Sequence, residues 1–279
     1  MTGKVTNLCG QLGIPRNDKM NRILAEFQAI GISIPEGNHP SFVLTRAMIK
    51  EAAQRLFCRS GIGLLKLADK RDRLIKLLDQ AGVRLTSEQW NQAALRNNDL
   101  FYAQPRALCG NLTGLVKRAK KSGIPITLGS YLAAALRQPA LFSAPPEQVM
   151  YNIIVIISAY EKEVFRLPDQ PVDIKIAKEW LVSYLMRHPA LLAQSSRCLN
   201  LWCTWHSLHA KQTMAAQKFL YFDQDDIKEI ENRLRQDHLK SGIKGPLKLG
   251  KKGKKIDEKT APGVLYRIFN RAKLLSRAA

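Results

Sequence analysis

Four arginines occupy the same place in a pattern that recurs along the chain, and their chemistry is that of anion binding. They are Arg55, Arg96, Arg137 and Arg187, and we call them the arginine series. A guanidinium presents a planar fork of donors that matches the oxygens of a phosphate group. Each of the four also falls in the last turn of a predicted helix, where it would instead satisfy backbone carbonyls and oppose the helix dipole. The sequence leaves both roles open.

Further basic residues lie on the second helix of two predicted units, and we take them as candidate phosphate ligands. They are Arg73, Lys76, Lys117, Arg118, Lys120 and Lys121. The alternative is that they form a solvated helix face with no ligand.

The third basic group stands near the C-terminus, in a segment rich in Lys, Gly and Pro. It includes Lys251, Lys252, Lys254 and Lys255. A basic arm of this composition favours phosphate binding that depends on salt and not on base sequence. A localisation signal, or contact with acidic lipid, is the alternative.

The overall charge points to the same class of partner. The 279 residues hold 44 Lys and Arg against 23 Asp and Glu, so the net charge is +21. From position 238 onwards there are 12 basic and 2 acidic residues, which gives 12 − 2 = +10 and leaves +11 for the rest. Such an excess is typical of proteins that bind a polyanion. We expect nucleic acid, DNA or RNA, with an anionic membrane surface or an acidic protein as the second possibility.

Other chemistry is not indicated. Cys198, Cys203, His206 and His209 are ligand types that zinc accepts, but one continuous helix would spread them over several faces. The sequence holds no phosphate-binding loop, no dinucleotide fingerprint and no zinc-protease motif. We therefore expect no metal, no cofactor and no enzyme activity.

Cysteine use and hydropathy bear on location. Five thinly spread cysteines fit a reducing compartment better than a disulfide framework. The first residues lack the apolar core of a secretion signal, and no apolar stretch reaches the ~18 residues of a membrane span. We expect a cytoplasmic protein, bacterial in the simplest case, with an organelle as the alternative.

The elements that position these residues are predicted by an internal repeat. A shift of 41 residues places Trp90 on Tyr131, Ala93–Arg96 on Ala134–Arg137, and Asn111 on Asn152. A fixed period of this size is typical of repeat architectures. An earlier copy begins near Leu44 and Thr45, and a fourth follows the third after 50 residues.

Each copy is predicted to form two helices separated by a break. Thr86 and Thr127 are suitable N-caps for the first helix, Asn98 or Pro139 ends it, and Pro146 suits the first turn of the second helix. The pattern predicts an all-α solenoid, right- or left-handed, of about four helix-break-helix repeats, followed by a basic tail with a short helix.

The predicted organisation has four parts. Residues 1–40 form a helical lead-in, and residues 41–210 form the helical-repeat domain. Residues 211–239 form a capping helix region, and residues 240–279 form a basic flexible tail that ends in an amphipathic helix. In the lead-in, Gly31 ends a helix in the same way as the joint at 78–85.

Two corner sequences carry a resemblance to a known family. Pro139-Ala140-Leu141-Phe142 with Pro146-Glu147, and later Pro189-Ala190-Leu191-Leu192, resemble the repeats of mitochondrial transcription termination factors (mTERF) over about residues 83–209. The period of 41, Asn98 at one corner and the Lys-rich tail depart from that family. The resemblance implies a curved all-helical solenoid that binds double-stranded nucleic acid on a basic concave side.

Three functions follow as hypotheses, the third being a membrane-surface protein held by the final amphipathic helix. The first is a non-enzymatic nucleic-acid-binding protein that contacts phosphates through a basic face and the tail. The second is a helical scaffold for protein partners, such as a bacterial effector or an assembly factor. The scaffold is favoured if the arginine series pairs with acids or helix ends inside the fold.

Overall fold

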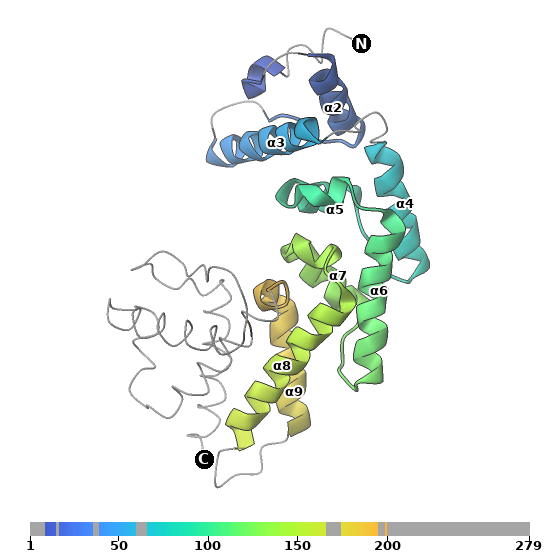
Figure 1. Cartoon of the computed structure of the whole chain (residues 1–279), viewed down its shortest axis with the longest axis vertical. Helices are drawn as coiled ribbons and strands as arrows, with labels where there is room; N and C mark the ends of the chain where they lie inside the picture. The colour runs from blue at the N-terminus through green and yellow to red at the C-terminus, as the bar shows by residue number, and fades with distance from the viewer. Residues whose placement is uncertain are drawn as a thin grey trace, which may run out of the picture. The chain divides into compact units, whose positions relative to one another are not determined.

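The computed structural model of this chain describes residues 9–14, 17–35, 39–59, 66–165, 174–194 and 199. Every regular element in these ranges is an α-helix or a 3₁₀ helix (Figure 1), which confirms the all-α prediction for this part of the chain. The chain divides into two compact units. One comprises residues 1–118 and 126–146, and the other comprises residues 119–125 and 147–279.

The lead-in contains helix α2 (Asp18–Ala29), whose apolar spacing produces one buried face. Asn17 caps its start, because the side-chain oxygen accepts a hydrogen bond from the Met20 N–H. Ile23 and Phe27 are almost fully buried. After the helix, Gly31 takes a left-handed conformation with φ of 82°, and the N–H of Ile32 reaches back to the carbonyl of Phe27. The predicted helix end at Gly31 is therefore confirmed.

Helix α3 (Pro40–Cys58) starts earlier than the repeat predicted. The alignment placed the start of the first copy at Leu44 and Thr45, but the helix begins at Pro40 with His39 as its cap. Proline is favoured at this position, because its fixed φ suits the first turn and its missing N–H has no helical partner there. Thr45 lies inside the helix, where its hydroxyl donates to the carbonyl of Ser41. The prediction of the start was wrong.

Helix α4 (Leu67–Gln80) is followed by two sets of elements in the same order: an α-helix, a 3₁₀ corner and a second α-helix. The first set is α5 (Ser87–Arg96), η2 (Asn98–Phe101) and α6 (Pro105–Lys121), and the second set is α7 (Leu128–Arg137), η3 (Pro139–Phe142) and α8 (Pro146–Phe165). Thr86 and Thr127 cap α5 and α7, and each forms a reciprocal capping box with the residue three positions on. The predicted caps and the predicted helix start at Pro146 are confirmed.

Small residues at equivalent positions allow the first helices of neighbouring copies of the repeat to pack closely. Ala93 and Ala94 of α5, and Ala134 and Ala135 of α7, are all fully buried. Helix α5 packs against both α3 and α7, as Figure 1 shows. Corner residues fill the remaining space, since the Phe142 ring meets the Trp90 ring edge-on at 5.8 Å between centroids.

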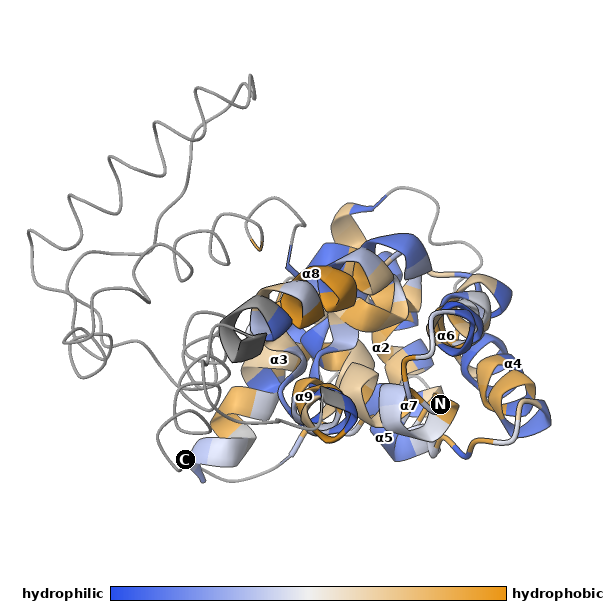
Figure 2. Ribbon diagram, turned by 90° about the horizontal axis from the view of Figure 1, so that it is seen from below, coloured by the Kyte–Doolittle hydropathy of each residue, from blue (hydrophilic) through white to orange (hydrophobic). Residues whose placement is uncertain are grey.

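The second compact unit contains most of α8, α9 (Ile174–Arg187) and η4 (Pro189–Leu191). In Figure 2, α8 carries the strongest apolar colour of the labelled helices. The Trp180 ring stacks between Tyr160 of α8 and Tyr184 of its own helix, at 6.1 and 5.2 Å between centroids. Leu191 and Leu192 are buried at the corner, as their match to Leu141 and Phe142 predicts.

One hydrogen bond recurs at equivalent positions. A side chain of a second helix donates to the carbonyl at the corner of the next copy: Lys70 to Phe101 at 3.2 Å, Asn111 to Phe142 at 3.1 Å, and Asn152 to Leu192 at 3.2 Å. The donors are spaced by 41 residues, and the acceptors by 41 and then 50, as the copies are in sequence. We call these three the corner bonds.

Helix joints recur as well. Gly82 and Gly123 have φ of 84° and 65°, close to Gly31, and the residue after each donates to the carbonyl five positions earlier. Only glycine adopts this conformation without strain from a Cβ. The similarity of the joints at 27–34 and 78–85 is thereby confirmed.

The predicted capping helix region at 211–239 and the tail at 240–279 lie outside the described residues, as does the insertion between the third and fourth copies. The four-part division stays a prediction. No helix among the described residues is long and apolar enough to cross a membrane.

Candidate nucleic-acid interface

The arginine series is engaged in contacts within the chain. Arg55 pairs with Glu51 one helical turn earlier, at 2.7 Å, while both side chains stay about 60% exposed (61% and 59%). The Nε of Arg187 donates to the Ser183 carbonyl of its own helix at 3.4 Å. Arg137 is exposed at the end of α7. The Arg187 bond to a backbone carbonyl matches the helix-end role that the sequence left open beside phosphate binding, whereas Arg55 pairs with an acid.

Arg96 makes three hydrogen bonds to backbone carbonyls. Its two terminal nitrogens donate to the carbonyls of Leu136 and Arg137, in the last turn of α7, and its Nε donates to Gln92 of its own helix. The last carbonyls of an α-helix have no partner within the helix. Arg96 therefore closes the end of α7, and its donors are not directed to a ligand.

The basic residues of α4 divide into two groups. Arg71 is 14% exposed and donates to the Ile30 carbonyl, which also accepts from Asn91 at 2.6 Å. Lys70 makes the first corner bond, and burial lowers the pKa of its amine below the usual 10.5. The predicted ligands Arg73 and Lys76 are both exposed to solvent.

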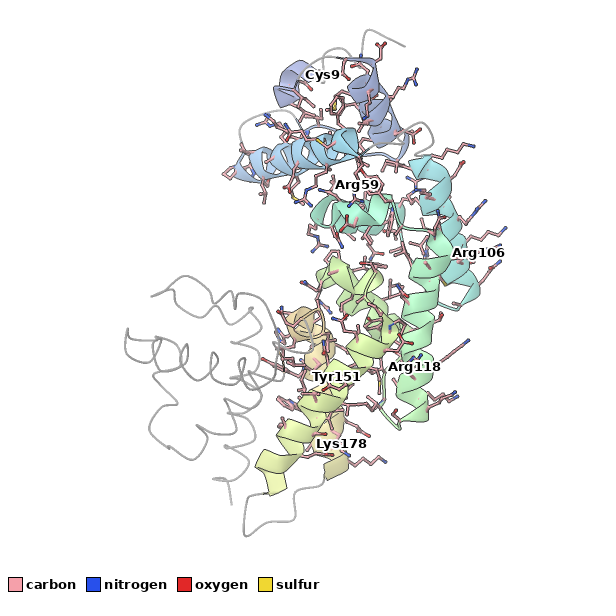
Figure 3. All side chains as sticks on the ribbon, viewed as in Figure 1. Cys9, Arg59, Arg106, Arg118, Tyr151 and Lys178 are labelled. Atoms are coloured by element: carbon pink, nitrogen blue, oxygen red, sulfur yellow. The ribbon has the colours of Figure 1, made fainter. Side chains whose placement is uncertain are left out.

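Helix α6 brings together the predicted ligands of the next copy. Lys117, Arg118, Lys120 and Lys121 are all exposed in its last two turns, and Arg106 is exposed in its first turn. Figure 3 labels Arg106 and Arg118 on this helix. Between Pro105 and Lys121 there is no acidic residue, so no charge on α6 opposes the five cations. Lys117, Lys120 and Lys121 form no side-chain hydrogen bond or ion pair in the part of the chain that the structure describes.

Several predicted residues lie where the structure gives no description. The tail lysines Lys251, Lys252, Lys254 and Lys255 are outside the described residues, and so is the cluster of Cys198, Cys203, His206 and His209. Within the described ranges, His, Cys, Asp and Glu side chains do not gather in a group of three that would hold a metal ion.

Two structural positions were missed from the sequence. The match of Asn111 with Asn152 was seen, but Lys70 in the same register was not, because an ammonium and an amide do not align by chemical type. Arg59 was also missed. It bridges Asp99 at 2.8 Å, and its guanidinium lies 4.1 Å from the centre of the Tyr102 ring. No periodic signal could have found these contacts, since Arg59 follows the end of α3, whereas Asp99 lies in η2 and Tyr102 directly after it.

No family model matches this chain, and searches of curated proteins and of solved structures return no match. The resemblance to mTERF repeats is therefore untested and stays a prediction.

Proposed function

We propose that this chain is a non-enzymatic nucleic-acid-binding protein, built as a solenoid of helical repeats, that contacts phosphate groups with basic side chains of its second helices. The observation that carries the proposal is α6, a helix with five exposed cations and no acid. Exposed Arg and Lys neutralise phosphates and release counterions, which supplies most of the affinity of non-specific binding.

The solenoid part of the proposal is supported by the recurring bonds. Corner bonds and glycine joints return with the spacing of the sequence repeat, which is what stacking of equivalent units would produce. Within the first compact unit, α5 packs against the first helices of the copies before and after it.

The contacts of the arginine series shift the expected site. Because Arg96 closes α7 and Arg55 pairs with Glu51, we assign phosphate contact to α6, with Arg73 and Lys76 of α4 as further ligands. The basic tail remains part of the proposal as a second source of affinity.

A salt titration of nucleic-acid binding tests the proposal. The full chain should bind a short duplex or single strand with an affinity that falls steeply between low and physiological salt. A variant with Lys117→Gln, Arg118→Gln, Lys120→Gln and Lys121→Gln should lose up to about 3.6 of the slope of log affinity against log salt, at about 0.9 per phosphate contact.

A charge-conserving variant is the matched control. Lys117→Arg, Lys120→Arg and Lys121→Arg keep every positive charge on the same exposed positions, so affinity and slope should stay near those of the parent chain. A flat salt response of the parent chain would contradict the proposal. An equal loss in both variants would show that charge is not the cause.

The scaffold function is the second candidate, and a specific observation favours it. Arg55, Arg96 and Arg187 contact groups of the chain itself, as expected for a protein whose ligand is not a polyanion. If the scaffold function holds, the parent chain binds no nucleic acid near physiological salt, and a purified protein partner binds equally to the parent chain and to the four-residue Gln variant.

A further inference from the structure

The exposed face of α6 has an unusual chemical content. Its exposed residues are basic or small: Arg106, Ala107, Gly110, Lys117, Arg118, Lys120 and Lys121. At 100° per residue, Arg106, Gly110, Lys117, Lys120 and Lys121 fall within a sector of about 100° on the helix. Four of the five cations thus form one stripe along the axis, with small residues between its two ends, and Arg118 lies beside the stripe.

The stripe carries no amide and no aromatic ring, which are two of the kinds of side chain that distinguish bases. Sequence is read chiefly by Asn and Gln amides, by Arg or Lys placed in a groove, and by aromatic rings that stack on bases. No aromatic residue occurs between Pro105 and Lys121. The helix has one amide, Asn111, and its nitrogen is engaged with the Phe142 carbonyl at 3.1 Å.

Space around the stripe also permits close approach of an extended anion. A Cβ built on Gly110 would meet no atom of the described residues within 4 Å, so in this part of the chain the middle of the stripe is open on the outside of the helix. The two ends carry the charge, with Arg106 at one end and the lysines of the last two turns at the other.

We propose that the α6 stripe binds the phosphodiester backbone of nucleic acid without reading the bases. The inference rests on the proposed function and adds to it the class of ligand that the site accepts. Phosphates are the same in every sequence, and contacts to them position a protein without selecting a site. Inorganic polyphosphate, which has the charges and no bases, should therefore compete for the stripe.

Binding of the full chain to three duplexes of equal length tests the inference: one with only A·T pairs, one with only G·C pairs and one mixed. The dissociation constants should agree within about threefold, since a single base-specific bidentate contact would separate them by about tenfold or more. Polyphosphate should displace all three, and the four-residue Gln variant should lose affinity for all three by the same factor.

Each contrary result has its own meaning. A preference of about tenfold for one duplex that the Gln variant abolishes would show that the stripe reads bases, which overturns the inference and leaves the proposed function standing. Equal, salt-dependent binding that the Gln variant does not weaken would place the contact elsewhere and also overturn the inference. Absence of salt-dependent binding to all three duplexes would overturn the proposed function itself.

The Gly110→Glu variant, which puts one negative charge into the open middle of the stripe, gives a second measure: it should weaken binding to all three duplexes.

Discussion

Arg96 closes the helix that ends at Leu136 and Arg137, because its guanidinium donates to the Leu136 carbonyl from one copy of the repeat to the next. The bond joins residues 40 positions apart, close to the period of the sequence. An arginine that recurs with the repeat thus serves the junction between copies, while Arg55 and Arg187 make contacts within their own helices.

Replacing Arg96 should lower stability more than replacing an exposed arginine with no such contact. We expect Arg96→Ala to cost about 1 kcal/mol of unfolding free energy, less than is usual for bonds to a charged donor because the side chain is exposed. Arg73→Ala on α4 is the control and should stay within about 0.5 kcal/mol. Urea denaturation of both variants measures the difference, and equal effects would contradict the assigned role.

The corner bonds should differ in strength with their burial. Asn152 is fully buried, and its nitrogen donates to both Leu192 and Gln194, so Asn152→Ala should cost about 2–3 kcal/mol. Asn111 is half-buried with one such bond, and Asn111→Ala should cost about 1 kcal/mol. Asn152→Asp, which keeps the size and removes the donor, should be at least as damaging as Asn152→Ala. Denaturant unfolding of the three variants gives the order, and a reversed order would exclude the corner bond as the cause.

Lys70 should make stability depend on pH in the alkaline range. Burial lowers its pKa in the folded chain below 10.5, so between the two values the unfolded chain binds more protons than the folded one. Stability then rises with pH as the medium approaches 10.5, relative to a chain without this amine. Lys70→Asn, which installs the amide found at Asn111 and Asn152, supplies that reference.

The comparison is made by denaturant unfolding of parent and Lys70→Asn between pH 7 and pH 10.5. The difference in unfolding free energy should move in favour of the parent chain as pH rises. A constant difference would mean that the Lys70 amine has the same pKa in both states.

Two glycines should respond to alanine in opposite directions. Gly82 has φ of 84°, so Gly82→Ala should cost about 1–2 kcal/mol through the left-handed backbone. Gly110 lies within α6 in open space, so Gly110→Ala should add about 0.5–1 kcal/mol through helix propensity. Thermal unfolding of both variants measures the two changes in stability. Changes of the same sign would contradict the explanation from backbone conformation.

The local features of the fold were predictable because they depend on neighbours in the sequence. The caps at Thr86 and Thr127 depend only on the residues three positions further on, and the helix end at Gly31 depends only on the helix before it. The start of α3 was not predictable from the repeat, since the choice between Thr45 and Pro40 depends on local capping chemistry that the other copies do not share.

The candidate site was predictable in part. Exposure of Lys117, Arg118, Lys120 and Lys121 follows from their spacing on an amphipathic helix. The partner of Arg96 does not, because it is a pair of carbonyls brought near by packing of α5 on α7. The type and register of a side chain indicate which groups it can bind. Which of those groups lie within hydrogen-bond distance depends on the three-dimensional packing of the helices.

Gly114 is a further position where the copies differ. A Cβ at this residue would lie 3.2 Å from the Cγ of Pro146, closer than side chains ordinarily come. The positions 41 residues before and after hold Arg73 and Val155. A chimera that replaced α6 by the second helix of a neighbouring copy would bring one of these side chains against the proline ring. The copies share a pattern but are not exchangeable parts, because a side chain at the Gly114 position would crowd the ring of Pro146.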